Sequence, residues 1–215
     1  MPTLDLKTIL NVIGLSAFLI SSPCHSAHCG ATGSLNVHKS ANGRAFIFYP
    51  SRSYGDSSFV LPGEEFHKDS SAPPEKVQFF VDGIHYEFLT TSKSQFISEG
   101  GSTDDASILA RHTAYEREFI KKVGNPRHKF HEVGSRQRPA VEGTPALLFR
   151  LWQMTVSKKK GDSSQYFLTT VFGDDVAMLS AIVGSGKEEA QALRALDSFA
   201  QTFKFLLSEE SCPPK

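Results

Sequence analysis

One β-hairpin constrains this chain more than any other feature of its sequence. Asp82-Gly83 separates two apolar runs at 77–81 and 84–89, and Asp-Gly in that position favours a two-residue type I′ turn. The second run alternates between apolar Ile84, Tyr86 and Phe88 and polar His85 and Glu87. This alternation predicts a strand with one face in the core and the other face, which bears the histidine and the glutamate, in water.

Other short apolar runs bounded by turn residues predict further strands. They lie at 44–49, 59–61, 129–133, 146–157, 165–172 and 176–183. Tight turns between neighbouring strands favour antiparallel pairing. We therefore expect an α+β fold, in which a twisted, mostly antiparallel sheet packs against helices on one face or on opposite faces.

Helical periodicity predicts a first helix over 104–123. In Ser102-Thr103-Asp104-Asp105 at its start, Ser or Thr can cap the free amides, and the acidic residues suit the positive end of the helix dipole. Its apolar stripe comprises Ile108, Leu109, Tyr115, Phe119, Ile120 and Val123. Its expected solvated side carries Arg111, Glu116, Arg117 and Glu118. Each such helix needs an apolar sheet face to cover.

A second helix is predicted over 187–203. Ser185 and Glu188 have the spacing of a capping box at its start. Its apolar stripe comprises Ala190, Leu193, Leu196, Phe199, Ala200 and Phe203.

The composition limits the classes of partner and fold. Lys+Arg and Asp+Glu both number 23, so no whole-chain field attracts nucleic acid, and we expect no nucleic-acid partner. With 40% apolar and 21% charged residues, the chain is neither disordered nor a polytopic membrane protein. Seventeen Phe residues predict a Phe-rich core or, as an alternative, a pocket for an apolar ligand.

The N-terminal segment has the order of a secretory signal peptide, which we place at residues 1–27. The apolar run 9–20 is shorter than the ~20 residues of a membrane span, and small residues follow it up to Ala27. Cleavage after Ser26 or Ala27 predicts an exported chain, periplasmic or secreted, with no transmembrane span. An uncleaved anchor or an amphipathic helix is the alternative.

A second exported form is a lipoprotein acylated at Cys24, but Pro23 disfavours processing there. After signal cleavage Cys29 and Cys212 remain, and two cysteines in an exported chain predict one disulfide; two unpaired thiols are the alternative. The predicted organisation is a flexible lead-in at 28–43, a single domain at 44–207 and a C-terminal tail at 208–215.

No motif predicts a catalytic, cofactor-binding or metal-binding residue. The turn from Val183 to Lys187 lacks the first glycine and the Ser/Thr of a phosphate loop. The Cys and His residues of 24–29 are too crowded for a tetrahedral zinc site. His128 and His131 are three apart on a predicted strand and point to opposite faces. His112 lies on or beside an apolar stripe, so each of these histidines is expected at the edge of the core or on the surface.

Three segments give the chain a family resemblance. They are Val141-Glu142-Gly143-Thr144-Pro145-Ala146 followed by the strands at 147–153 and 166–169, Leu196-Asp197-Ser198-Phe199, and Phe203-Lys204-Phe205. From Arg44 to Phe205 the sequence resembles the superfamily of photosystem PsbP, the envelope lipoprotein DcrB and a nuclear Ran-release factor. The insertion at 51–75 departs from that family's compact pattern.

The resemblance implies an antiparallel sheet sandwiched between helices, a role in binding or assembly, and no shared catalytic residues. We therefore expect an exported, non-enzymatic binding or assembly domain of the cell envelope or the extracellular space, with no cofactor. A small secreted hydrolase whose site comes from distant strands is one alternative. A carrier of an apolar ligand is the other.

Overall fold

The computed structural model describes residues 34–41, 43–49, 56–69, 77–98, 100–123, 128–141, 144–156, 163–184 and 186–206. Its strands are β1 (Ser34–Ser40), β2 (Gly43–Tyr49), β3 (Asp56–Leu61), β4 (Phe66–Lys68), β5 (Val77–Val81), β6 (Ile84–Ser92), β7 (Lys129–Arg138), β8 (Leu147–Val156), β9 (Ser163–Phe172), β10 (Asp175–Val183) and β11 (Lys204–Leu206). Its helices are the 3₁₀ helix η1 (Lys93–Phe96), α2 (Asp105–Val123) and α3 (Lys187–Thr202).

The larger sheet has seven strands in the order β4-β5-β6-β10-β9-β8-β7, and every described pair in it is antiparallel. The predicted hairpin is confirmed, because β5 pairs with β6 across Asp82 and Gly83. Both turn residues have positive φ, 47° and 81°, as a type I′ turn requires.

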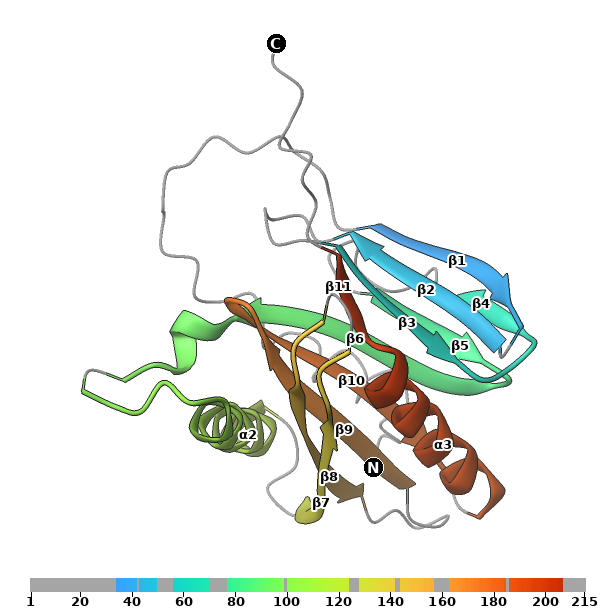
Figure 1. Cartoon of the computed structure of the whole chain (residues 1–215). Helices are drawn as coiled ribbons and strands as arrows, with labels where there is room; N and C mark the ends of the chain where they lie inside the picture. The colour runs from blue at the N-terminus through green and yellow to red at the C-terminus, as the bar shows by residue number, and fades with distance from the viewer. Residues whose placement is uncertain are drawn as a thin grey trace.

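The two long helices cover opposite faces of this sheet (Figure 1). α2 contacts β8 and β9 on one face, and α3 contacts β9 and β10 on the other. The expected α+β class is thus confirmed, and the helices take opposite faces in an α/β/α sandwich. The face that carries α3 is also covered by a second sheet of four antiparallel strands, β1-β2-β3-β11, which the sequence analysis did not predict.

The predicted flexible lead-in at 28–43 is wrong over 34–40, where the chain forms β1. β1 pairs with β2 from Ser34↔Tyr49 to Ser40↔Gly43. An outer strand with one face in water has many polar residues. The sequence of β1 therefore lacks the apolar run that predicts a strand. Gly43 makes the turn possible, since its φ is 134° and a Cβ there would lie 2.2 Å from the carbonyl oxygen of Leu61.

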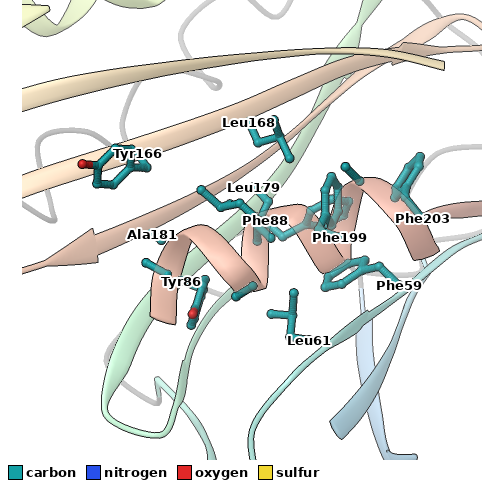
Figure 2. Close-up of a cluster of buried hydrophobic side chains, with 14 of the residues drawn as sticks. Phe59, Leu61, Tyr86, Phe88, Tyr166, Leu168, Leu179, Ala181, Phe199 and Phe203 are labelled. Carbon is teal, nitrogen blue, oxygen red and sulfur yellow. The ribbon is translucent and has the colours of Figure 1, made fainter. Parts of the chain in front are cut away.

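Phenylalanine rings fill the interior between the two sheets and α3 (Figure 2). Phe199 of α3 lies at the centre, with its ring centroid 5.0 Å from Phe59 and 6.1 Å from Phe88. Phe46 stacks on Phe59 at 5.2 Å. Such contacts contribute about 0.5–1.5 kcal/mol per pair beyond the area that they bury, so core packing accounts for much of the high Phe content.

Helix α3 also completes the edge of the smaller sheet. β11 pairs with β3 only at residues 56–58 of β3, which leaves Val60 without a strand on that side. Ser198 Oγ donates to the carbonyl of Val60 at 2.8 Å, and the amide of Val60 donates to Thr202 Oγ1 at 2.8 Å. Two hydroxyl side chains of a helix therefore replace a missing strand.

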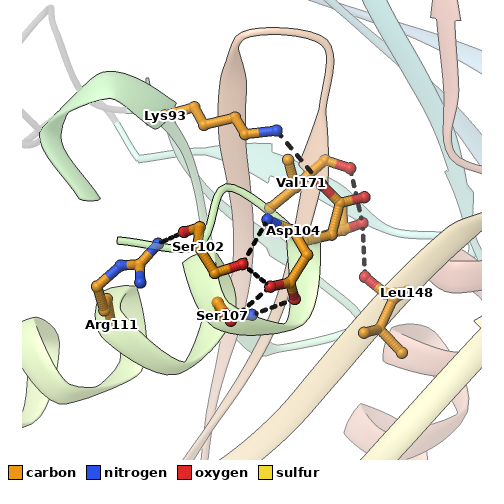
Figure 3. A network of polar contacts seen from close by, with 9 residues as sticks. Lys93, Ser102, Asp104, Ser107, Arg111, Leu148 and Val171 are labelled. Carbon is orange, nitrogen blue, oxygen red and sulfur yellow. Dashed lines mark hydrogen bonds and ion pairs between the residues drawn. The ribbon is translucent and has the colours of Figure 1, made fainter. Parts of the chain in front are cut away.

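Helix α2 begins at the side chain of Asp104 (Figure 3). Its carboxylate accepts from the amide of Ser107 at 2.9 Å and from the Ser107 hydroxyl at 2.6 Å, and it also accepts from Ser102 Oγ. These hydrogen bonds hold the pKa of Asp104 below its ordinary value. The cap was expected from Ser or Thr, but the amide of Ser107 donates to the Asp104 carboxylate, so Asp104 makes it.

Helix α3 begins without a side-chain cap. Its N-cap is Gly186, which makes no side-chain hydrogen bond, and Ser185 of the predicted capping box lies outside the described residues. Glu188 Oε2 accepts from the amide of Gly184 at 2.7 Å. The Glu188 carboxylate thus accepts a hydrogen bond from the backbone of the turn 183–187, which resembles part of a phosphate loop.

Candidate functional site

The middle of α2 is polar on the side that packs against the sheet. Its buried residues are Ile108, Leu109, His112, Thr113, Glu116 and Ile120. The expectation that Glu116 lies on a solvated side is therefore wrong, since only 6% of it is exposed. The predicted stripe included Tyr115 and Val123, which are 38% and 39% exposed. A repeated spacing of four residues from Ile108 selects the buried residues His112, Glu116 and Ile120, although two of them are polar.

Apolar contacts hold α2 at its two ends. Ile108 and Leu109 pack in a cluster with Phe96, Val171 and Val176. Ile120 packs in a separate cluster with Trp152, Phe167, Met154 and Met178. The polar residues His112, Thr113 and Glu116 lie between these clusters along the helix, so the centre of this interface rests on polar groups.

The sheet also presents polar groups on this face. His85 and Glu87 of β6 were expected in water, but they are only 5% and 3% exposed, and that expectation is wrong. The alternation of β6 marks two chemically different faces, but β6 lies inside the sheet between β5 and β10 and both of its faces are covered. Glu87 is in register with Gln78 of β5 and with Ser180 of β10.

Three ionisable side chains lie between α2 and the sheet, and their charges depend on their protonation states. We call Glu87, His112 and Glu116 the α2 polar cluster. His112 Nε2 lies 3.8 Å from Glu116 Oε1. Burial lowers the pKa of His112 to about 4. Burial, together with the negative charge of Glu87, raises the pKa of Glu116 to about 7.

Both pKa shifts favour the neutral forms, as expected where charge cannot be solvated. His112 is fully enclosed, and within the described ranges neither of its ring nitrogens has a hydrogen-bond partner. Its ring packs at 4.9 Å against Phe96. A pair of titratable groups with pKa values displaced in opposite directions is a recognised signature of acid–base sites, although here both groups face the protein interior.

Two histidines of the sequence analysis lie at or near β7. His131 of β7 is exposed, and His128 is half-buried with a pKa that burial lowers. Within the part of the chain that the structure describes, no three His, Cys, Asp or Glu residues are grouped to hold a metal ion.

Several predicted features fall outside the described residues: the signal segment 1–27, Cys24, the candidate disulfide partners Cys29 and Cys212, and the tail 208–215. Among the described helices, none is both long and apolar enough to cross a membrane.

Sequence reasoning missed Arg138, at the end of β7. This residue is only 8% exposed, and its Nη1 donates to the carbonyl of Phe203 at the C-terminus of α3. Its Nε and Nη2 are buried and have no hydrogen-bond partner among the described residues. No local pattern distinguishes this arginine, because β7 is otherwise rich in exposed polar residues.

No family model matches the sequence, and no curated protein matches it. Some solved structures are similar to it. A protein from Bacteroides thetaiotaomicron is 12% identical with a TM-score of 0.40 over 73% of this chain, which spans 47% of that protein. PsbP from Synechocystis sp. PCC 6803 is 12% identical with a TM-score of 0.40, over 86% of this chain and 98% of that one.

A point mutant of the protein Mog1 is 13% identical to this chain with a TM-score of 0.44, over 81% of this chain and 97% of Mog1. The neighbours thus include both PsbP and the Ran-release factor that the sequence resemblance names. At these identities and scores the similarity concerns the arrangement of helices and strands, and it assigns no ligand or partner.

Proposed function

We propose that this chain is an exported, non-enzymatic domain that binds or helps to assemble a partner protein in the cell envelope or outside the cell. The observation that carries this proposal is the outer strand β7. It has ten residues, it pairs with β8 on one side, and it ends the order of the described sheet. An extended segment of a partner can add to such an edge through backbone hydrogen bonds.

The part of β7 after its bulge suits this role best. The register shifts between Glu132 and Gly134, and such a bulge interrupts regular pairing along an edge. Beyond the bulge, Ser135 and Gln137 are exposed. Arg136 makes an ion pair of 2.9 Å with Asp197 of α3, which connects this segment to the helix.

Two further observations support the proposal. His112 and Glu116, whose pKa values are displaced towards the neutral forms, are enclosed beneath α2, which suits a packing role. The apolar run 9–20 with small residues after it supports export.

The test places a photo-crosslinking amino acid at Ser135 in the full chain, expressed in its native host. The matched control places it at Glu118, which is exposed on α2. We expect one defined adduct in the envelope or external fraction at Ser135 and none at Glu118. The purified adduct partner should then bind the wild-type chain, and Gln137→Pro should weaken that binding. Equal labelling at both positions contradicts the proposal.

A hydrolase is a second candidate, favoured by the displaced pKa values of His112 and Glu116 in one cluster. Ester and peptide substrates are offered to wild type, His112→Gln and Glu116→Gln. Turnover that both substitutions abolish in folded protein would replace the binding proposal with this one.

A further inference from the structure

Arg138 is a cation enclosed at the junction of β7, β8 and the end of α3. It pairs in register with Leu147 of β8, and its side chain reaches the carbonyl of Phe203. Burial lowers the pKa of its guanidinium, yet arginine stays protonated in proteins. Unlike His112 or Glu116, this group cannot escape the cost of burial by becoming neutral.

The carbonyl of Phe203 satisfies only part of this guanidinium. It occupies Nη1, and the negative end of the α3 dipole stabilises some of the charge. Nε and Nη2 remain buried, and no acceptor for them lies in the described part of the chain. No ion pair joins Arg138 to any carboxylate of the described residues, and Asp197 of α3 is bonded to Arg136.

In another arginine of this protein, Arg150, the Nε and Nη2 atoms bind a carboxylate. Arg150 donates from Nε to Oε1 of Glu132 at 3.1 Å and from Nη2 to Oε2 at 2.8 Å. This bidentate arrangement matches the planar guanidinium to the two oxygens of one carboxylate. Arg138 presents the identical edge with both donors unused.

Nε and Nη2 of Arg117 also have no acceptor among the residues that the structure describes, but the surroundings of Arg117 differ. Its guanidinium carbon lies 5.7 Å from the centre of the Trp152 ring, and its charge lowers the pKa of the Glu132 carboxyl. It is also only half-buried. Arg117 therefore has both a π-face and a negative charge near it.

We propose that the Nε–Nη2 edge of Arg138 is a binding site for one carboxylate group. Two sources share this chemistry. One is the chain's own Glu209 or Glu210, which follow three and four residues after Leu206, where β11 ends. The other is an acidic group of a separate molecule. The site does not depend on the function proposed for β7.

The test observes the Nε–Hε signals of the arginines by NMR in the full chain. Arg138→Lys assigns the Arg138 signal, and backbone-linked assignment does so independently if that variant fails to fold. The Arg150 signal marks a carboxylate-bound guanidinium in the same spectrum. Arg136→Lys, on the same face of β7, is the control for general disturbance of the strand.

The sources are separated by the double variant Glu209→Gln/Glu210→Gln and by sodium acetate titrated against sodium chloride at equal ionic strength. If the tail supplies the carboxylate, the Arg138 signal resembles that of Arg150 in wild type, moves in the double variant and is restored by acetate. If another molecule supplies it, the double variant changes nothing, and acetate shifts the wild-type signal saturably.

Acetate should also raise the urea midpoint of the protein, wild type or double variant, in which the Nε–Nη2 edge of Arg138 is empty. The reason is that a ligand that binds only the native state stabilises it. Arg138→Lys should abolish that rise, and Arg136→Lys should not. The proposal is overturned if the Arg138 proton exchanges freely with solvent in both proteins and acetate has no more effect than chloride.

Discussion

The hydroxyl of Ser198 on α3 donates a hydrogen bond of 2.8 Å to the carbonyl oxygen of Val60, which lies 138 residues earlier in the chain. This bond and the one from the amide of Val60 to Thr202 join α3 to the open side of β3. They explain a serine next to Phe199, since one residue of the pair satisfies a strand edge while the other fills the core.

Ser198→Ala should lower the free energy of unfolding by about 1 kcal/mol, because it removes the shorter of the two hydroxyl contacts to the half-buried carbonyl of Val60 and leaves only Thr202 Oγ1 at 3.3 Å. Urea unfolding should show a lower midpoint with an unchanged slope. Ser135→Ala, at an exposed position on β7, is the control and should leave the midpoint in place. Equal midpoints for Ser198→Ala and wild type would contradict the role given to this bond.

The elements that could be predicted from the sequence are those with local causes. The β5–β6 hairpin follows from two turn residues that accept positive φ. The first helix was predicted over 104–123, and α2 occupies Asp105–Val123. In both cases the residues that decide the structure lie within a few positions of it.

The elements that were missed depend on distant parts of the chain. β11 has three residues and exists by pairing with β3, which is far away in sequence. The burial of Glu87 and Glu116 depends on which element covers each face, and the pattern of β6 alone shows only that its faces differ. The same holds for Arg138, whose enclosure follows from the position where α3 ends.

Gly43→Ala should destabilise the protein by more than about 2 kcal/mol. Its φ of 134° strains any side chain, and the new Cβ would collide with the carbonyl of Leu61. Gly173→Ala is the matched control, since its φ is 53° but a Cβ there meets nothing within 4 Å. The control should cost about 1 kcal/mol. Equal losses in thermal unfolding would show that the close approach of β2 to Leu61 does not constrain this turn.

Ile108→Ala and Val123→Ala compare two apolar residues that the hydrophobic pattern of α2 treats alike. Ile108 is fully buried, and its truncation should cost about 2–5 kcal/mol. Val123 is 39% exposed, and its truncation should change stability by less than about 0.5 kcal/mol. Urea denaturation of both variants measures the difference. If Val123→Ala lost as much stability as Ile108→Ala, the assignment of the buried side of α2 would be wrong.

His112 and Glu116 should give opposite pH dependences of stability. The folded pKa of His112, about 4, lies below its ordinary value of 6.5, so stability from this group is complete above pH 6.5 and is lost as pH falls. The folded pKa of Glu116, about 7, lies above its ordinary value of 4.5. Stability from Glu116 is therefore complete below pH 4.5 and is lost as pH rises. Between pH 4.5 and 6.5 the two slopes, each about 1.4 kcal/mol per pH unit, oppose one another.

Single substitutions should uncover each slope. Relative to wild type, His112→Gln should lose stability as pH rises through this range, and Glu116→Gln should lose it as pH falls. Both side chains are largely neutral in the folded protein there, so removing one leaves the charge around the other almost unchanged. Urea unfolding at several pH values measures the differences, in which all other titrating groups cancel. Glu118→Gln, on the exposed side of α2, is the control. If all four proteins gave parallel profiles, the neutral pair beneath α2 would be ruled out.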